Sequence, residues 1–311
     1  MFDALQGFIT VSVPIVLGYL IARFNVIAPE TAKQLNLLAV TVLIPVLLFV
    51  IMSESDPRLL FSRMALVSFL AAAAAFLAYA LIAGLAWRPG GAAVTVGALA
   101  AGYTNAGNIG LPIATHMLGD PALVAPIVLF QTGLFAPIGL AILAAFTKHD
   151  RAAGSLPVWK TILGAICNPI VIGSLSGMAV AATHWQVPLV VMEPVRLIAG
   201  GGIPVMLIAF GMSLRDTPVL AKNSPRRQIA LISVIKLLAM PLAAWTLARF
   251  VFGLGPAAVY AVTAMAALPT AQNVFSYATR YEASPILARD AVTVTTLGAA
   301  PMVFIVAALL S

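Results

Sequence analysis

Charge is what this sequence has least of. Of its 311 residues only 9% are Asp, Glu, Lys or Arg, while 62% are hydrophobic and the mean hydropathy is +1.05. Soluble domains carry roughly a quarter of their residues as charged side chains. We therefore predict an integral membrane protein. The single cysteine excludes an internal disulfide, and the three scattered histidines form no metal-ligand cluster.

Enzymatic motifs are missing as well. Neither the zinc-binding HExxH pattern nor the phosphate-binding GxxxxGK[ST] pattern occurs, and GSLSG at 173–177 has Ser174 where an intramembrane serine protease requires its first glycine. The acidic residues fall at span ends or in connections, so the predicted membrane core offers no carboxylate to a cation/proton antiporter. We predict a transporter rather than an enzyme, with no catalytic residue, no metal and no cofactor.

What the sequence does contain is a series of apolar runs separated by short polar connections. About 20 apolar residues are needed to cross a bilayer core of about 30 Å as a helix. On this basis we predict ten spans, the first of them a retained helix rather than a signal peptide. They lie at about 5–22, 33–52, 60–87, 92–118, 122–147, 159–182, 189–213, 228–251, 256–279 and 288–310.

The basic residues are distributed unevenly over the connections. Twelve Lys and Arg residues fall in the odd-numbered connections and four on the opposite side. Because cytoplasmic loops carry an excess of Lys and Arg, this places the odd connections in the cytoplasm and both termini on the extracytoplasmic side of the cytoplasmic (inner) membrane. The net charge of +7 is explained by this topology and not by nucleic-acid binding.

Prolines recur in the two halves of the chain in the same order, at offsets of 155–164 residues. The pairs are Pro14 with Pro169, Pro45 with Pro204, Pro112 with Pro269, and Pro137 with Pro301. We interpret residues 1–155 and 156–311 as two copies of a five-span repeat. Since five is odd, the second copy enters the membrane from the opposite side, which is the inverted repeat typical of secondary transporters.

Two stretches interrupt the apolar pattern at equivalent depths of the fourth and ninth spans: GYTNAGNIGLP at 102–112 and ALPTAQN at 267–273. Proline lacks an N–H, so we expect Pro112 and Pro269 to free the carbonyls of Asn108 and Met265 and to break both helices. A break creates a half-helix N-terminus with unpaired N–H groups and partial positive charge, which suits an anion. The alternative is that the amides only hold helices together.

The candidate substrate-binding residues surround these two interruptions. Side-chain amides would donate and accept hydrogen bonds there, and glycine would let the backbone unwind. The set is Asn105, Gly107, Asn108, Pro112, Pro269, Thr270, Gln272 and Asn273.

Two further residues have a possible charge or proton role. Lys236 lies within the eighth span and could attract an anion or relay a proton, although we favour snorkelling of its long stem toward the cytoplasmic end. His116 follows Pro112 by one turn, and we favour a hydrogen-bonded histidine near the outer end of its span.

These features together resemble the auxin efflux carrier family, which includes the plant PIN auxin exporters and bacterial malonate transporters. NAGNIGLP in the fourth span and LPTAQN in the ninth carry the resemblance, which covers essentially the whole chain. It implies an all-α fold like that of sodium/proton antiporters and bile-acid symporters, with crossing helices broken at Pro112 and Pro269. It also implies a scaffold of spans 1, 2, 6 and 7, a transport domain of spans 3–5 and 8–10, and a homodimer.

The function that this resemblance favours is secondary transport of a small organic anion, such as a malonate-like dicarboxylate, by alternating access. Coupling to a proton or to sodium remains open. One alternative is a sodium-coupled bile-acid-type carrier, with the freed carbonyls and Gln272 as cation ligands, or an auxin-like monocarboxylate carrier. Another is a passive channel or a membrane sensor that transports nothing. The long central cytoplasmic loop of the plant exporters is missing from this chain.

Overall fold

The computed structural model describes residues 2–28, 30–56, 58, 62–146, 169–213, 215, 220 and 223–310, and this part of the chain is helical without strands. Helices occupy most of the described residues of every predicted span. Six helical stretches are long and apolar enough to cross a membrane, and four further apolar helices are shorter. An all-α membrane protein is therefore confirmed, whereas ten crossings and an inverted repeat stay predictions. The start of the sixth predicted span, 159–168, which includes Cys167, lies outside the described residues.

The chain divides into two compact units that do not follow the two sequence halves. Unit 1 contains residues 1–62, 107–128 and 166–217, and unit 2 contains residues 63–106, 129–165 and 218–311. Each unit therefore combines segments from both halves of the chain, and the fourth predicted span is divided between the units after Ala106.

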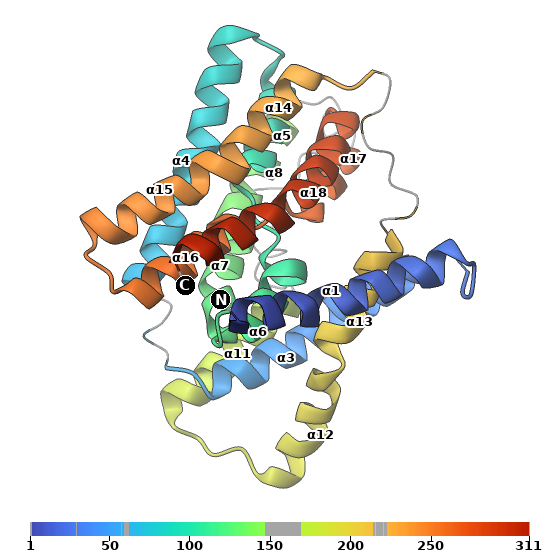
Figure 1. Ribbon diagram of the computed structural model, residues 1–311, viewed down its shortest axis with the longest axis vertical. Coiled ribbons are helices and arrows are strands. Elements are labelled where there is room, and N and C mark those ends of the chain that lie inside the picture. Colours follow the sequence, from blue (N-terminus) through green and yellow to red (C-terminus); the bar gives the residue numbers. More distant parts are fainter. Residues whose placement is uncertain are drawn as a thin grey trace. The chain divides into compact units, whose positions relative to one another are not determined.

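The elements of unit 1 come from the first, second, sixth and seventh predicted spans, from the end of the fourth and from the start of the fifth (Figure 1). They are α1 (Phe2–Arg23), α2 (Thr31–Leu38), η1 (Ala39–Leu43), α3 (Ile44–Ser53), most of η3 (Ala106–Gly110), α6 (Leu111–His116), η4 (Pro121–Leu123), most of α7 (Val124–Phe130), α11 (Pro169–Thr183), α12 (Leu189–Gly200) and α13 (Gly202–Ser213).

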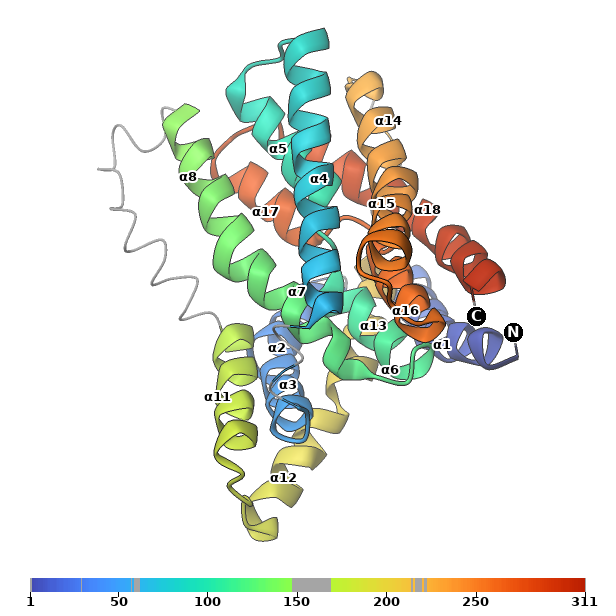
Figure 2. The same ribbon diagram turned by 90° about the vertical axis from the view of Figure 1, so that its left-hand side faces the viewer.

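The helices of unit 2 come from the third to fifth and the eighth to tenth predicted spans (Figure 2). They are α4 (Arg63–Ala86), α5 (Gly91–Gly102), η5 (Gln131–Phe135), α8 (Ala136–Phe146), α14 (Arg226–Val234), η6 (Ile235–Ala239), α15 (Met240–Thr246), η7 (Leu247–Val251), α16 (Pro256–Ala266), α17 (Gln272–Arg280) and α18 (Pro285–Leu310).

Two helix pairs of unit 1 pack backbone against backbone through glycine. Helix α11 lies along α3, as both views show, and a β-carbon at Gly173 would collide with the carbonyl oxygen of Pro45 (Figures 1 and 2). Helix α1 packs on α13 in the same way, since a β-carbon at Gly211 would meet the carbonyl oxygen of Ile15. Small residues allow this close approach in membranes. Each pair joins a first-half helix to a second-half helix, a reciprocity that a duplicated chain predicts.

Unit 2 has a core built largely of alanine. Helix α4 illustrates the pattern, because its small residues face inward and its large apolar residues face outward. Ala71, Ala75 and Ala83 are buried in the core of the unit. Leu77, Leu81 and Leu85 on another face of the same helix are 60–75% exposed. A water-soluble helix would place its leucines inside, so this arrangement indicates a helix whose leucine face contacts lipid.

Four prolines within the spans follow a wider, π-helical turn and do not interrupt the helix. Five π-helical turns occur among the described residues, and four of them end two residues before a proline. The prolines concerned are Pro45, Pro112, Pro137 and Pro241. A proline has no N–H and its ring crowds the carbonyl four residues earlier. A wider π-helical turn accommodates that conflict while the chain stays helical.

Candidate functional site

The chain is truly interrupted at two places in unit 2. Helix α5 ends at Gly102 and is followed by an extended residue, Tyr103, before helical structure resumes at Ala106. Helix α16 ends at Ala266, and α17 begins only at Gln272, after a non-helical stretch around Pro269. The first interruption therefore precedes Pro112 by several residues, and the expectation that Pro112 itself breaks the fourth span is wrong. The second coincides with Pro269, as predicted.

The two interruptions pair with each other through their backbones. The N–H of Asn105 donates to the carbonyl oxygen of Pro269 at 2.8 Å, and the N–H of Ala271 donates to the carbonyl oxygen of Tyr103 at 3.0 Å. Thr104 and Thr270 thereby form an isolated antiparallel β-bridge. We call residues 103–105 and 267–271 the crossover. Irregular backbone is tolerated at membrane depth only where its polar groups are satisfied by protein or water, and here each interruption satisfies the other.

Side chains complete the hydrogen bonding of the crossover. With the Gln131 amide oriented so that both of its groups are satisfied, its nitrogen donates to the Thr104 carbonyl and its oxygen accepts from the Thr104 N–H, both at 2.9 Å. The Thr270 N–H donates to Oγ1 of Thr295 at 3.1 Å, and the Thr270 hydroxyl donates to the Ala100 carbonyl at 2.6 Å. The crossover is thus held by helices α5, η5 and α18 of the same unit.

The expectation of a freed Met265 carbonyl is also wrong. Its oxygen accepts a hydrogen bond from the N–H of Leu268 at 3.4 Å, because the chain turns immediately after α16. Asn108, the residue of the other predicted carbonyl, lies in the π-helical turn η3 and has a partner of its own. The Met265 carbonyl is therefore not left free by Pro269.

Lys236 is fully buried and points into the crossover. Its Nζ lies 2.7 Å from Oγ1 of Thr104, 3.4 Å from the carbonyl oxygen of Ala266 and 3.1 Å from Sδ of Met240. Thr104 belongs to the first interruption, and Ala266 is the last helical residue before the second. The favoured interpretation, that the stem of Lys236 snorkels toward the cytoplasmic end of its span, is wrong because the side chain is 0% exposed.

The predicted substrate-binding residues fall into both units. Asn105, Pro269, Thr270, Gln272 and Asn273 lie in unit 2. Asn105 and Thr270 are buried, Gln272 is half-buried and Asn273 is exposed, the last two in the first turn of α17. Tyr103 packs against Tyr277, in the second turn of α17, at 6.4 Å between ring centroids.

The remaining predicted residues lie in unit 1. Gly107 and Asn108 are half-buried in η3, and Pro112 is buried in α6. His116 is the last residue of α6 and is exposed. The structure therefore gathers Asn105, Thr270 and Lys236 around the crossover of unit 2, and it places Asn108, Pro112 and His116 together only along their own segment.

Asp290 lies in the second turn of α18, close to the span end where the sequence places it, but its side chain is 0% exposed. It pairs with the guanidinium of Arg289 at 2.8 Å and accepts a hydrogen bond from the hydroxyl of Ser224. Its position at the span end agrees with the sequence analysis, whereas its burial was not predicted. Its charge is balanced by the neighbouring Arg289, and its bond with Ser224 links the start of α18 to the segment before α14.

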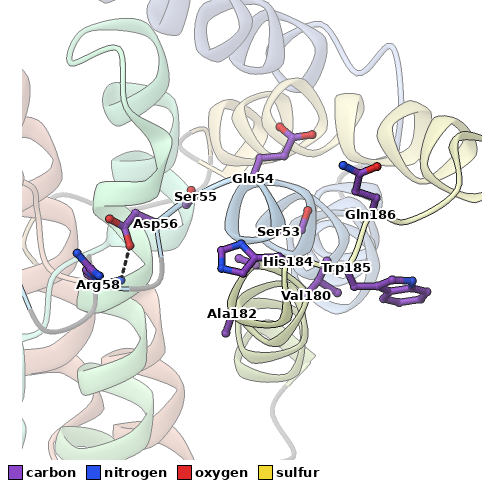
Figure 3. Close-up of a pocket in the computed structure, with 11 residues that line it drawn as sticks. Ser53, Glu54, Ser55, Asp56, Arg58, Val180, Ala182, His184, Trp185 and Gln186 are labelled. Atoms are coloured by element: carbon purple, nitrogen blue, oxygen red, sulfur yellow. Dashed lines mark hydrogen bonds between the residues drawn. The ribbon is translucent and has the colours of Figure 1, made fainter.

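Unit 1 contains a hollow of about 810 Å³ between the end of α3 and the end of α11 (Figure 3). Glu54, Asp56, His184, Trp185 and Gln186 line it, and the Asp56 carboxylate accepts from the N–H of Arg58 at 2.9 Å. Glu54 also pairs with Arg196 of α12 at 2.7 Å. None of the predicted substrate-binding residues lines this hollow, and its charged residues Glu54, Asp56 and Arg58 are exposed.

Three contributors to the crossover are not among the predicted site residues: Thr104, Gln131 and Thr295. Thr104 lies inside the GYTNAGNIGLP stretch, but nothing in the sequence assigns its side chain a role. Gln131 and Lys236 share a recognisable signal, since each lies in a π-helical turn, five or six residues before a proline of its own span. A polar residue five or six positions before a proline in an apolar span therefore indicates a candidate site residue, because π-helical turns are frequent at functional sites.

Two comparisons with known proteins bear on this site. A family model described as "Membrane transport protein" matches residues 4–152 and 156–307. A protein of Rhizobium meliloti (strain 1021), named "Putative malonate transporter", is 27% identical over 288 residues, which cover 91% of this chain and 88% of that protein.

Proposed function

Because the chain belongs to the membrane transport protein family, the family of the auxin efflux carriers, we propose that it is a secondary transporter of small organic anions. The proposed substrate class is malonate-like dicarboxylates, and the proposed mechanism is alternating access in the cytoplasmic membrane. The Rhizobium relative, named for malonate, supports this substrate class. We further propose that both termini are extracytoplasmic and that the protein is a homodimer.

One observation carries the proposal: α17 begins directly at the crossover and presents polar side chains in its first turn. The first N–H groups of a helix have no partner within the helix, and its N-terminus carries partial positive charge. Gln272 is half-buried there and Asn273 is exposed. Lys236 adds a formal positive charge on the inner side of the same crossover. A carboxylate at this helix end would find hydrogen-bond donors and favourable electrostatics in one place.

Unit 2 is the part of the chain that we assign to transport, and unit 1 is the scaffold. The crossover belongs entirely to unit 2, and its backbone is tied to α5, η5 and α18 of that unit. A substrate held at the start of α17 therefore travels with unit 2. Asn108 remains a proposed substrate-binding residue, and movement of the transport part relative to the scaffold exposes the anion alternately to the two sides of the membrane.

The proposal is tested by uptake of radiolabelled malonate into proteoliposomes, with saturable counterflow to distinguish a carrier from a channel. Asn273→Ala and Asn108→Ala should abolish uptake while leaving the thermal midpoint of the purified protein unchanged. Asn36→Ala, at a half-buried asparagine of α2 that is not among the predicted site residues, is the matched control and should transport normally. Uptake at the unmodified rate in Asn273→Ala would refute the assignment of the site.

The substrate class has its own measurement. A ligand that binds only the folded protein raises its apparent stability. We therefore expect malonate to raise the thermal midpoint of the unmodified protein more than acetate does, because a second carboxylate adds a second anionic group. An equal effect of acetate, or a larger effect of an aromatic monocarboxylate, would contradict the dicarboxylate class.

A further inference from the structure

Lys236 contacts both interruptions of the crossover at once. Its Nζ donates to the Thr104 side chain of the first interruption and to the Ala266 carbonyl at the edge of the second. A third acceptor, Sδ of Met240, lies one helical turn further along its own span. An ammonium has three N–H donors and no acceptor, so these three contacts use its full hydrogen-bonding capacity.

No carboxylate balances this charge among the residues that the structure describes. The buried carboxylate of unit 2, Asp290, is paired with Arg289. The groups around Nζ are a hydroxyl, a backbone carbonyl and a thioether, all of them neutral. Neutral oxygens from unwound helices are the ligands with which broken-helix transporters hold a coupling cation. In this chain a side chain of the protein occupies such a set of ligands.

We propose that Lys236 is a resident cation of the crossover, which occupies the place of a coupling metal cation and makes transport independent of sodium. The inference extends the proposed transport function to its ion coupling. Its physical basis is that the ammonium is tethered through the backbone of η6, so its positive charge stays in unit 2 in every state of the cycle. A dissociable ion would instead have to bind and leave in each cycle.

The inference predicts that removal of the side chain creates a site for a free organic cation. Lys236→Ala removes the three methylene groups beyond Cβ together with the ammonium, and n-propylammonium has the same three carbons and the same charge. The Thr104 hydroxyl and the Ala266 carbonyl remain in place to receive it. We expect n-propylammonium to raise the thermal midpoint of Lys236→Ala by several degrees and to leave the unmodified protein unaffected.

Two small molecules serve as controls for charge and for shape. The neutral 1-propanol fills the same space without a charge, and tetramethylammonium has the charge but no N–H donor. Neither should stabilise Lys236→Ala. Equal stabilisation by 1-propanol would show that the site is only an apolar void and would overturn the proposal. Lys33→Ala, at an exposed lysine of α2, should respond to none of these compounds.

Uptake provides the second readout. Lys236→Ala should lose malonate uptake, n-propylammonium should restore part of it, and Lys236→Arg should retain more uptake than Lys236→Met because it keeps the charge. For the unmodified protein, replacing sodium by N-methylglucamine on both sides should leave the initial rate unchanged. A rate that depends on sodium would overturn the proposal while leaving organic-anion transport intact.

The two proposals can fail separately. If Lys236→Ala does not fold, the sodium dependence of uptake by the unmodified protein decides whether Lys236 replaces a coupling cation. In the same thermal comparison, n-propylammonium should not stabilise Lys236→Met, because the methionine side chain fills the space. If the unmodified protein transports no dicarboxylate while Lys236→Ala is stabilised selectively by n-propylammonium, the resident cation stands and the proposed substrate class falls.

Discussion

Replacing Thr104 by valine isolates a single hydrogen bond of the crossover. The substitution keeps the branched shape of the side chain and removes the hydroxyl that lies 2.7 Å from Nζ of Lys236. The backbone of Thr104 keeps its two bonds to Gln131. We therefore expect the whole effect to arise from an ammonium left with one acceptor fewer in a fully buried position.

The size of the effect follows from the charge of the donor. Hydrogen bonds to charged groups contribute about 1.5–3 kcal/mol, whereas side-chain hydrogen bonds between helices of a membrane protein average about 0.6 kcal/mol. We expect Thr104→Val to lower the free energy of unfolding by about 1.5–3 kcal/mol. Thr263→Val is the matched control, because this equally buried hydroxyl bonds only to the Val259 carbonyl of its own helix. It should cost less than about 0.6 kcal/mol.

A double-mutant cycle makes the comparison independent of packing differences. Unfolding is measured in mixed detergent micelles for the single and double substitutions of Thr104→Val with Lys236→Met. In the Lys236→Met background the hydroxyl no longer faces a cation, so Thr104→Val should cost about 1 kcal/mol less than in the unmodified protein. An identical cost in both backgrounds, or a cost equal to that of Thr263→Val, would refute the reasoning.

Two further predictions concern packing and the second interruption. Gly173→Ala should lower the thermal midpoint and cost about 1–3 kcal/mol of stability, because the new β-carbon meets the rigid Pro45 carbonyl. The control Gly84→Ala, with open space around the new β-carbon, should be neutral or stabilising. Equal midpoints for the two variants would contradict the close packing of α11 on α3. Thr270→Val should cost about 1 kcal/mol through loss of its bond to the Ala100 carbonyl, measured by the same micelle unfolding, and an unchanged free energy would show that this bond adds nothing.

The helical segments were predictable because their cause is local. Apolar runs of sufficient length have one stable backbone in lipid, and the observed helices fill the described parts of the predicted spans. The position of the first interruption was not predictable from Pro112, since a proline removes a donor without deciding how the helix responds. Here the response at Pro112 is a π-helical turn, and the interruption occurs at Tyr103, where pairing with the second interruption is available.

The surroundings of Lys236 illustrate what spacing along the sequence leaves open. A lysine near the end of a span can snorkel or turn inward, and the choice depends on acceptors supplied by distant segments. Those acceptors, the Thr104 hydroxyl and the Ala266 carbonyl, come from two other spans. The same limit applies to Asp290, whose burial depends on Ser224 from a different segment. Polar positions could be identified from the sequence, but their partners required the fold.

The pairing of the two interruptions also affects how the protein is made. The bond from Thr270 to Ala100 joins residues 170 positions apart, and the backbone bonds of the crossover join segments nearly as distant. While the ribosome is still translating the second half, the backbone bonds that join residues 103–105 to Pro269 and Ala271 cannot yet form, although Gln131 is already available to Thr104. Insertion of the fourth span into the bilayer is therefore completed late, and a separately expressed first half should require its counterpart, or protection by the insertion machinery, before it can mature.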